Sequence, residues 1–271
     1  MPELPEVETT RRGIHDHLLG ATVSELIVRN GRLRWPVPDD LADLVVGKTI
    51  YSIGRRAKYL LLGFEHGTLI IHLGMSGSMR IFTEAFPAEK HDHIDLVLSN
   101  GKRLRYHDPR RFGSWLWSHT PVNEHPLLKS LGPEPLSSAF HAAALQQQLQ
   151  GRKTAIKQLI MDNHIVVGVG NIYASESLFL ARIHPTRSGQ SLSPAEVTCL
   201  VAAIKETLDA AIAAGGSTLK DYVDSDGRSG YFMLNNYVYG RNEEACRLCG
   251  TPIQKIQQGQ RATFFCAHCQ H

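Results

Sequence analysis

The chain has 271 residues, of which 42% are hydrophobic and 20% charged, so it can form one large globular domain or two ordinary ones. No apolar run approaches the roughly 20 residues that span a bilayer. The N-terminal residues are acidic and lack the apolar stretch of a secretory signal. These features exclude a membrane-embedded protein, and we expect a cytoplasmic one. The net charge of +3 does not by itself indicate nucleic-acid binding.

A helix is predicted over residues 5–19. Pro5 suits the first helical position, and Glu6 and Glu8 suit the positive end of the helix dipole. Gly20 ends the pattern. Short β-rich runs with turn residues between them follow as far as Trp117, and such regular runs predict a sandwich or a barrel. These runs are 24–28, 58–62, 68–73, 94–98 and 114–117.

Basic residues cluster at two places in this strand-rich half. Residues 101–112 hold Lys102, Arg103, Arg105, Arg110 and Arg111 against the single acid Asp108, and Arg55, Arg56 and Lys58 form a second group. Clustered cations favour a polyanionic partner. Solvated strand edges are the alternative interpretation.

A boundary is predicted at 131–138, where two prolines and a glycine can sustain neither helix nor strand. Beyond it we expect helices over 138–149, 153–161, 170–180 and 193–214. Ser193, Pro194 and Glu196 are typical of a helix start. Cys199, within this last pattern, is interpreted as a small core residue. The polar, glycine-containing segment 215–241 is expected to be a lid or a binding loop.

Four cysteines in the last 26 residues predict a metal site. Cys246-x2-Cys249 and Cys266-x2-Cys269 have the spacing of a zinc ribbon, in which four thiolates hold Zn²⁺ tetrahedrally. The residues between the pairs can form a β-hairpin. With four sulfur ligands the ion leaves no open position for catalysis, so its expected role is structural.

A glycine-rich turn at 166–170 leads into the helix that begins near Asn171. Free amides at a helix start attract a phosphate, and the Asn171 side chain can add a donor. Arg152, Lys153 and Lys157 precede this turn and strengthen the phosphate interpretation. Glycine-helix starts are also common without a ligand.

The N-terminus is the third chemical signal. If Met1 is removed, Pro2 carries a secondary amine, and α-amino groups titrate near pH 7.7–8.0. Such an amine can attack a sugar C1′ and form an iminium, which eases elimination. Glu3 and Glu6 are close enough in sequence to act as acid and base. The alternative is an ordinary proline before a solvated acidic helix start.

These motifs together resemble one family. The segments that carry the resemblance are Met1–Glu8, Arg55–Tyr59, His72–Gly77, Asp108–Gly113, the turn before Asn171 and the four cysteines. In this order they resemble bacterial formamidopyrimidine-DNA glycosylase, an 8-oxoguanine glycosylase and AP lyase. The resemblance extends over essentially the whole chain.

The resemblance implies catalytic roles for five residues. Pro2 would be the Schiff-base nucleophile, and Glu3 the proton donor for sugar opening and base loss, with support from Glu6. Lys58 would serve β-elimination and contact phosphate. Arg261 would hold phosphates from the zinc hairpin and assist δ-elimination.

The resemblance also implies contacts to DNA. The residues implied to bind it are His72, Met75, His91, Arg110, Phe112, Arg152 and Asn171. Met75, Arg110 and Phe112 would fill the gap in the base stack, where Met75 and Phe112 are suitable apolar wedges and Arg110 can read the orphan base. Without the resemblance, Met75 and Phe112 could equally be packing residues. Glu176 and Lys220 would belong to the lesion pocket.

The implied fold is α+β, with an N-terminal β-sandwich that carries the catalytic helix and a helical helix–two-turn–helix domain with a zinc-ribbon hairpin. The expected domains are 1–131, a linker at 132–137, 138–236 and 237–271. One structural Zn²⁺ is expected, without a catalytic metal or redox cofactor. The expected partner of this monomer is double-stranded DNA with oxidised bases, reached in the cytoplasm and at the nucleoid.

Three other functions stay open at this point. An endonuclease VIII-type glycosylase for oxidised pyrimidines is the nearest, although that branch tends to carry glycine where this chain has Glu3. A damage-binding protein without catalysis would not require Pro2, Glu3 and Lys58. An RNA-binding zinc-ribbon protein would leave the N-terminus unexplained.

Overall fold

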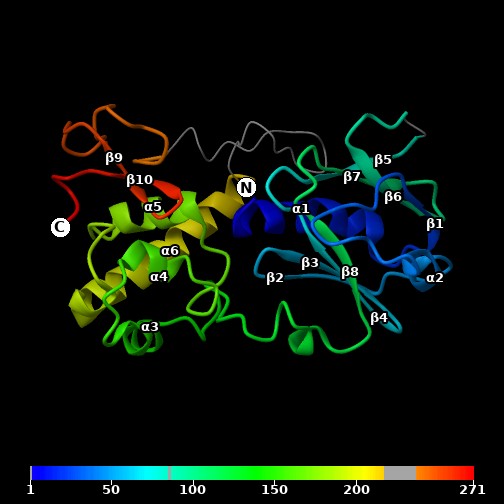
Figure 1. Ribbon diagram of the computed structural model, residues 1–271, viewed down its shortest axis with the longest axis horizontal. Helices are drawn as coiled ribbons and strands as arrows, with labels where there is room; N and C mark the ends of the chain where they lie inside the picture. Colours follow the sequence, from blue (N-terminus) through cyan, green and yellow to red (C-terminus); the bar gives the residue numbers. More distant parts are fainter. Residues whose placement is uncertain (1, 85–86, 217–235) are drawn as a thin grey trace. The chain divides into compact units, whose positions relative to one another are not determined.

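The computed structural model describes residues 2–84, 87–216 and 236–271. The described chain forms two compact units, one from residues 2–129 with 214–216 and the other from 130–213 with 236–271. Strands dominate the first unit and helices the second (Figure 1). No helix within the described ranges combines the length and the apolar character that a membrane span requires.

The first unit contains two four-stranded antiparallel sheets. One sheet has the order β1-β6-β7-β5 and the other β2-β3-β4-β8. Alternate side chains of a strand face opposite sides, and β3 shows this alternation of half-buried and buried residues. The inward residues of both sheets form a single core in which the fully buried Trp115 packs among leucines and isoleucines. The strands are β1 (Val23–Val28), β2 (Ser52–Arg56), β3 (Tyr59–Phe64), β4 (Gly67–His72), β5 (Ser78–Phe82), β6 (Asp92–Leu98), β7 (Arg103–His107) and β8 (Ser114–Ser118).

The described chain passes between the two sheets three times, and the last two of these crossings lie at neighbouring places. Residues 73–77 join β4 to β5, and residues 108–113 join β7 to β8. β4 pairs with β8 through His72 and Ser114, and β5 pairs with β7 through Ser78 and His107. Because both ends of the two crossings are paired, the crossings lie side by side. We call these two segments the wedge turns.

Helix α1 (Leu4–Leu18) precedes the sandwich and packs on β2, β3 and β5. Glu3 is its N-cap, and Glu3 and Glu6 form a reciprocal capping box. Val7, Ile14 and Leu18 share the core of the sheets. The short helix α2 (Leu41–Val45) and the 3₁₀ turn η1 (Val122–Glu124) complete this unit.

The second unit is built on four helices and one hairpin. Helix α5 contacts α4, α6 and β10, and it is buried from Ile172 to Phe179. A helix buried on every side must be covered by its neighbours on every side, which is consistent with its central position in this unit. The elements are α3 (Ala142–Leu149), α4 (Ile156–Ile160), α5 (Asn171–Leu180), η2 (Gly189–Ser191), α6 (Pro194–Ala213), β9 (Gln254–Gln258) and β10 (Arg261–Phe265).

The predicted sandwich, helical region and hairpin are confirmed, and so is the start of α6. Ser193 Oγ accepts from the Glu196 amide at 3.3 Å, and Glu196 accepts from the Ser193 amide at 2.8 Å. The strands β2, β5 and β7 were not predicted, since arginines interrupt their apolar pattern. The interpretation of Cys199 as a core residue is wrong, because its side chain is exposed on α6.

Candidate active site and nucleic-acid interface

The first described residues, which lead into α1, are buried. Pro2 is buried, and Glu3 and Glu6 are 3% and 0% exposed. The Glu6 carboxylate accepts from the Glu3 backbone N–H at 2.7 Å, which fixes the direction of the first residues. A Cβ at Gly216, the last described residue before 236, would lie 3.2 Å from Glu6 Oε1. The alternative of a solvated acidic helix start is therefore wrong.

Lys58 lies in the two-residue turn between β2 and β3. Its neighbour Ala57 has a φ of 52°, as tight hairpin turns require at such a position. The Arg55 guanidinium donates to the Ala57 carbonyl at 2.8 Å and to the Glu8 carboxylate on α1 at 3.2 Å. One side chain thus links helix α1 to the turn of Lys58.

Glu8 is held as an anion by three arginines. Burial opposes its ionisation, but hydrogen bonds from Arg11 and Arg12 and the charges of Arg11 and Arg55 lower the pKa of the Glu8 carboxyl to about 2. The Arg11 and Arg12 contacts measure 2.8 and 2.9 Å. The second basic cluster of the sequence therefore contains one cation, Arg55, that is already paired within the protein.

His72 is a neutral side chain at the end of β4. Burial, with the charges of Lys58 and Arg34, lowers the pKa of the His72 imidazole to about 4. Its Nδ1 accepts from the Gly74 amide at 2.9 Å, so the ring fixes the first wedge turn. The Tyr59 ring packs on it with centroids 4.8 Å apart.

Both wedge turns expose an apolar side chain. Met75 is 38% exposed and Phe112 44%, and with Arg34, His72 and Gly74 they border a hollow of about 410 Å³. Exposed large apolar side chains that adjoin one another mark an interaction site. Arg110 lies beside them, with its guanidinium carbon 5.0 Å from the centre of the Phe112 ring. His91 lies beside the second wedge turn, since its backbone carbonyl accepts from the Asp108 amide at 3.0 Å.

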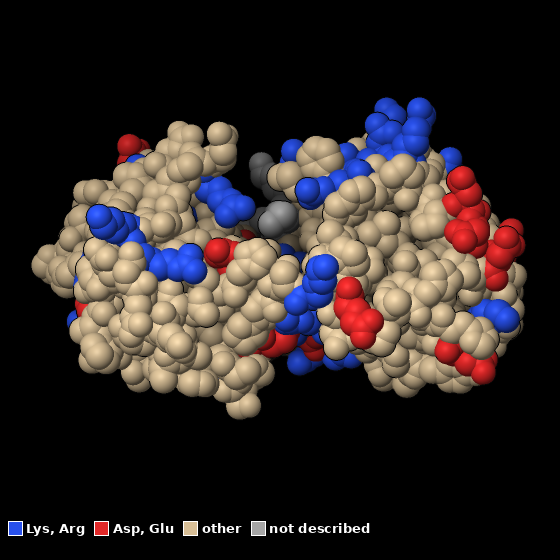
Figure 2. Space-filling view, turned by 60° about the horizontal axis from the view of Figure 1, so that its bottom comes forward, with Lys and Arg blue, Asp and Glu red and all other residues tan. Residues whose placement is uncertain are grey.

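The first basic cluster separates into internal and exposed members. Arg105 is 2% exposed and donates to Asp95 at 2.9 and 3.0 Å, and Arg103 donates to Asp95 at 2.8 Å. These two arginines of the cluster are thus already compensated by a buried carboxylate inside the protein. Arg110 and Arg111 stay exposed. In Figure 2 basic side chains gather at the top of the strand-rich unit, whereas along its right edge acidic side chains lie beside a basic one.

Asn171, at the start of α5, is fixed by the zinc hairpin and by a buried lysine. Its Oδ1 accepts from Lys157 Nζ at 2.7 Å, and its Nδ2 donates to the Ala262 carbonyl at 2.9 Å. Lys157 is 2% exposed and also donates to Thr263 Oγ1 at 2.7 Å. Lys157 therefore does not strengthen the phosphate interpretation of this turn, since its ammonium joins α4 to β10.

Arg261 begins β10 at the exposed end of the hairpin. Its guanidinium lies 3.9 Å from Met161 Sδ, and it borders a hollow of about 360 Å³ between α4 and the hairpin. Gly259 makes the turn before it with a φ of 58°. Arg152 follows α3, where it is exposed and donates to the Gln148 carbonyl at 3.1 Å.

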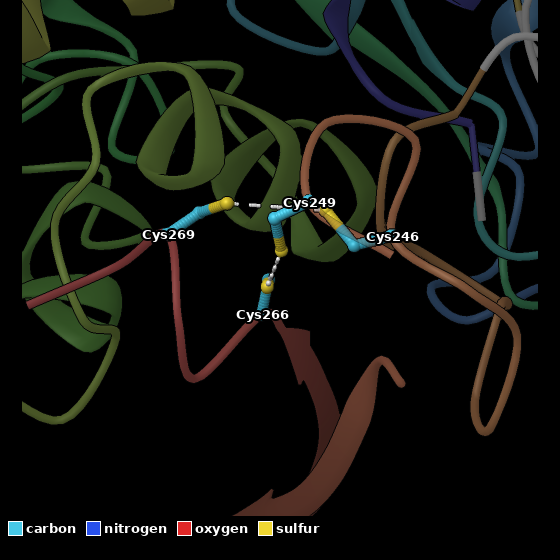
Figure 3. Close-up of side chains that lie close together, drawn as sticks. All are labelled: Cys246, Cys249, Cys266 and Cys269. Atoms are coloured by element: carbon cyan, nitrogen blue, oxygen red, sulfur yellow. Dashed lines mark hydrogen bonds between the residues drawn. The ribbon is translucent and has the colours of Figure 1, made fainter. Parts of the chain in front are cut away.

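The four cysteines lie together at the base of this hairpin (Figure 3). Their Sγ atoms are within 4.8 Å of one another, with 3.9 Å between Cys246 and Cys269 and 3.5 Å between Cys249 and Cys266. Zn–S bonds of about 2.3 Å in a tetrahedron place sulfur atoms about 3.8 Å apart, so this set fits one Zn²⁺. Phe179 of α5 and Phe264 pack on the same cluster.

Glu176 anchors the chain where it re-enters the described part of the structure. Its buried carboxylate accepts from the backbone N–H groups of Tyr237, Val238 and Tyr239 at 2.7, 3.0 and 2.8 Å. Burial raises the pKa of Glu176, although these three hydrogen bonds and the charge of Arg247 oppose the rise. Its predicted partner in the lesion pocket, Lys220, lies outside the described residues.

Three family models match the chain in succession. The formamidopyrimidine-DNA glycosylase N-terminal domain matches residues 1–115, the H2TH domain of the same glycosylase 131–223, and the zinc finger found in FPG and IleRS 243–271. The chain belongs to the formamidopyrimidine-DNA glycosylase family.

Named relatives of this family are similar over their full length. A formamidopyrimidine-DNA glycosylase of Hydrogenovibrio crunogenus is 60% identical, with 100% of this chain and 96% of the relative covered. Two crystal structures of Lactococcus lactis Fpg are 36% identical, each with a TM-score of 0.92. One is a complex with DNA that contains an abasic site and covers 99% of both chains. The other contains an N7-benzyl-Fapy-dG lesion and covers 100% of both.

The two units divide the predicted site residues of this chain. The sandwich unit holds Pro2, Glu3, Glu6, Lys58, His72, Met75, His91, Arg110 and Phe112, and the helical unit holds Arg152, Asn171, Glu176, Arg261 and the cysteines. The sequence did not indicate three residues that hold these side chains in place, which are Glu8, Lys157 and Asp108. For Asp108, the only available signal in the sequence was the presence of a single acid within the first basic cluster.

Proposed function

We propose that this chain is a bifunctional DNA glycosylase and AP lyase of base excision repair. It would excise oxidised purines such as 8-oxoguanine and formamidopyrimidines and then cut the strand by β,δ-elimination. The observation that carries the proposal is the buried Pro2–Glu3–Glu6 start of α1 in a chain of this family. That arrangement supports chemistry at the N-terminal amine, which a binding protein would not need.

Pro2 is the proposed nucleophile. After removal of Met1 its secondary amine attacks C1′ of the damaged nucleotide, and the sugar–base bond breaks as the base leaves. Glu3 is the proposed proton donor, and Glu6 keeps Glu3 in position through the 2.7 Å backbone hydrogen bond. The Pro2 nitrogen loses its proton, the C1′–O4′ bond breaks, and O4′ takes a proton from Glu3 as the sugar opens, which leaves an iminium between the nitrogen and C1′. This iminium withdraws electrons from C2′, which makes the later loss of a proton there easier.

Lys58 and Arg261 are proposed to serve the two elimination steps. In β-elimination a C2′ proton is lost and the 3′ phosphate leaves, and in δ-elimination a C4′ proton is lost and the 5′ phosphate leaves. Lys58 is fixed for this task by the Arg55 hydrogen bond to its turn. Arg261 would stabilise the leaving phosphate from the hairpin.

A base inside a duplex hides C1′, so the damaged nucleotide must leave the stack at a cost of about a few kcal/mol. Met75 and Phe112 are proposed to fill the gap, and their exposure on adjacent turns supports this role. Arg110 is proposed to read the orphan cytosine with two hydrogen bonds.

Phosphates are proposed to meet His72, His91, Arg152 and Asn171. Asn171 Nδ2 has two hydrogens, and the Ala262 carbonyl uses one, so the other can donate to a phosphate. Glu176 would shape the pocket through the segment it anchors, and Lys220 would contact the everted base. We keep 1–131, 138–236 and 237–271 as the proposed domains of a monomer that acts on DNA in the cytoplasm and at the nucleoid.

Borohydride trapping tests the function. The enzyme is incubated with a duplex that carries one 8-oxoguanine opposite cytosine, reduced, and mapped by mass spectrometry. We expect an adduct on the amine of Pro2, because the iminium is reducible. If an adduct forms only on a duplex with oxidised thymine, the chain is instead an endonuclease VIII-type glycosylase for oxidised pyrimidines. No adduct on either duplex would overturn the catalytic proposal.

A further inference from the structure

Asp108 stands at the base of the second wedge turn and is 0% exposed. A buried carboxylate is costly unless donors surround it, and three donors converge on this one. Ser76 Oγ donates to Oδ1 at 2.7 Å, while the Tyr106 hydroxyl and the Gly113 amide donate to Oδ2 at 2.9 and 3.0 Å. Ser76 belongs to the first wedge turn and Gly113 to the second. One carboxylate therefore joins the two.

The hydroxyl of Ser76 extends the connection to Arg110. While it donates to Asp108, it accepts from the Arg110 backbone N–H at 3.2 Å. Ser76 directly follows Met75, and Gly113 directly follows Phe112. The Asp108 network thus holds the backbone next to each of the three side chains that the proposed function places in the base stack.

The backbone of Asp108 is itself fixed from β6. Its carbonyl accepts from His93 Nε2 at 2.8 Å and from the Arg111 amide at 3.2 Å, and its N–H donates to the His91 carbonyl at 3.0 Å. His93 is buried, so this support lies in the interior of the sandwich. Asp108 is consequently a rigid point to which the turns are attached.

The two wedge turns also touch through their backbones. A Cβ at Gly74 would overlap the Gly113 nitrogen and the Phe112 carbonyl carbon, and a Cβ at Gly113 would overlap the Tyr106 hydroxyl. Neither turn can move toward the other, and the hydrogen bonds to Asp108 prevent them from separating.

We propose that Asp108 is a positioning residue that makes Met75, Arg110 and Phe112 enter the base stack as one rigid unit. This inference rests on the proposed function. If the Asp108 carboxylate or its hydrogen bond from Ser76 is lost, the two wedge turns separate. The apolar side chains and Arg110 then no longer enter the base stack in a fixed arrangement. Eversion and recognition of the opposite base then weaken, while the chemistry at Pro2 does not change.

The test compares two variants with matched controls. Ser76→Ala removes the hydroxyl that joins the turns, and Ser114→Ala removes a buried hydroxyl nearby that has no hydrogen-bond partner among the described residues. Asp108→Asn removes the charge at the centre, and Asp95→Asn removes the charge of another buried carboxylate in the same unit. Thermal unfolding identifies any variant that fails to fold.

Two activities are measured for each folded variant. The first is single-turnover excision of 8-oxoguanine opposite cytosine and opposite adenine in a duplex. The second is cleavage of a single-stranded abasic oligonucleotide, which has no stack to fill and no opposite base. We expect Ser76→Ala to slow duplex excision by about 10- to 100-fold and to reduce discrimination between the opposite bases, with single-strand cleavage unchanged. Ser114→Ala should match the wild type.

The outcomes separate the two proposals. Wild-type rates and discrimination in both Ser76→Ala and Asp108→Asn would overturn the positioning role. An equal loss on duplex and single-stranded substrates would overturn it as well, because a merely structural role affects both. A wild-type enzyme that cannot be trapped on any damaged DNA would instead overturn the proposed function.

Discussion

The Arg55 guanidinium and the Glu8 carboxylate join two separate parts of the sandwich unit, with 3.2 Å between Nε and Oε2. Glu8 is one turn into α1, the helix that begins beside Pro2, and Arg55 also holds the turn of Lys58. One ion pair thus connects the helix of Pro2, the proposed nucleophile, to the turn of Lys58, the lysine proposed for elimination.

The first prediction concerns this pair. Glu8→Gln should slow cleavage of an abasic duplex by about 5- to 10-fold, since weakening a charged hydrogen bond costs about 1–1.5 kcal/mol and loosens the Lys58 turn. Affinity for the same duplex should change little. Single-turnover cleavage and fluorescence anisotropy measure the two quantities. Glu25→Gln, an exposed change on β1, is the control, and equal rates for both variants would contradict the prediction.

A second prediction concerns the buried ammonium of Lys157. Lys157→Met keeps the volume but leaves the Asn171 and Thr263 oxygens without their donor, which should lower stability by about 1–3 kcal/mol. DNA affinity should fall as well, because Asn171 loses its orientation. Denaturant unfolding and binding measure both effects. Lys153→Met, at an exposed position, should leave stability unchanged.

Asp95 gives the stability of the sandwich unit a dependence on pH. Burial opposes its ionisation, but hydrogen bonds from Arg105, Arg29 and Arg103 lower the pKa of Asp95 to about 2 from its ordinary 3.8. Its contribution is therefore present above pH 3.8 and is lost as the pH falls toward 2. Asp95→Asn should lower the melting temperature at pH 7, and this difference should shrink as the pH approaches 2. A difference in melting temperature that stays the same at every pH would contradict the stabilising role of the ionised Asp95 carboxylate.

Removal of zinc should release the hairpin from α5. Cys249→Ser or a strong chelator should abolish the stoichiometric Zn²⁺, lower the melting temperature of the helical unit and impair strand cleavage, because Arg261 and the Ala262 contact to Asn171 depend on the hairpin. Metal analysis, calorimetry and a cleavage assay test this together. Cys199→Ser, on the exposed side of α6, should retain zinc and activity.

The final prediction uses salt. Phosphate contacts make affinity fall steeply with salt, and each lost contact reduces the slope of log K against log salt by about 1. Arg152→Gln should show this reduction. Arg103→Gln should not, because Arg103 is already paired with Asp95. Identical slopes for Arg152→Gln and the wild type would remove Arg152 from the interface.

Local signals in the sequence were sufficient to predict several helices and the metal site. The proline and glutamates of α1, the Ser193 cap of α6 and the two Cys-x2-Cys pairs act over a few residues, so their patterns are readable. The strands β2, β5 and β7 could not be predicted, because segments that contain arginines look like solvated loops as long as the partners of those arginines are not known.

The residues that support the site could not be predicted, because their partners are distant in sequence. Lys157 meets Thr263 across 106 positions, and Ser76 meets Asp108 across 32. A lysine among other basic residues and an aspartate among arginines look exposed until the fold shows which groups surround them. Motif positions predict the reacting groups, while the residues that hold those groups in place became visible only in three dimensions.

The contact between Gly74 and Gly113 has a consequence for protein design. The distance between the two wedge turns is set by the contact of their backbones and not by the Met75 and Phe112 side chains that they carry. Met75 and Phe112 can therefore be exchanged for other apolar groups to suit a narrower or wider gap while their separation stays constant. A single methyl group at either glycine would change that separation, however well the two side chains themselves were chosen.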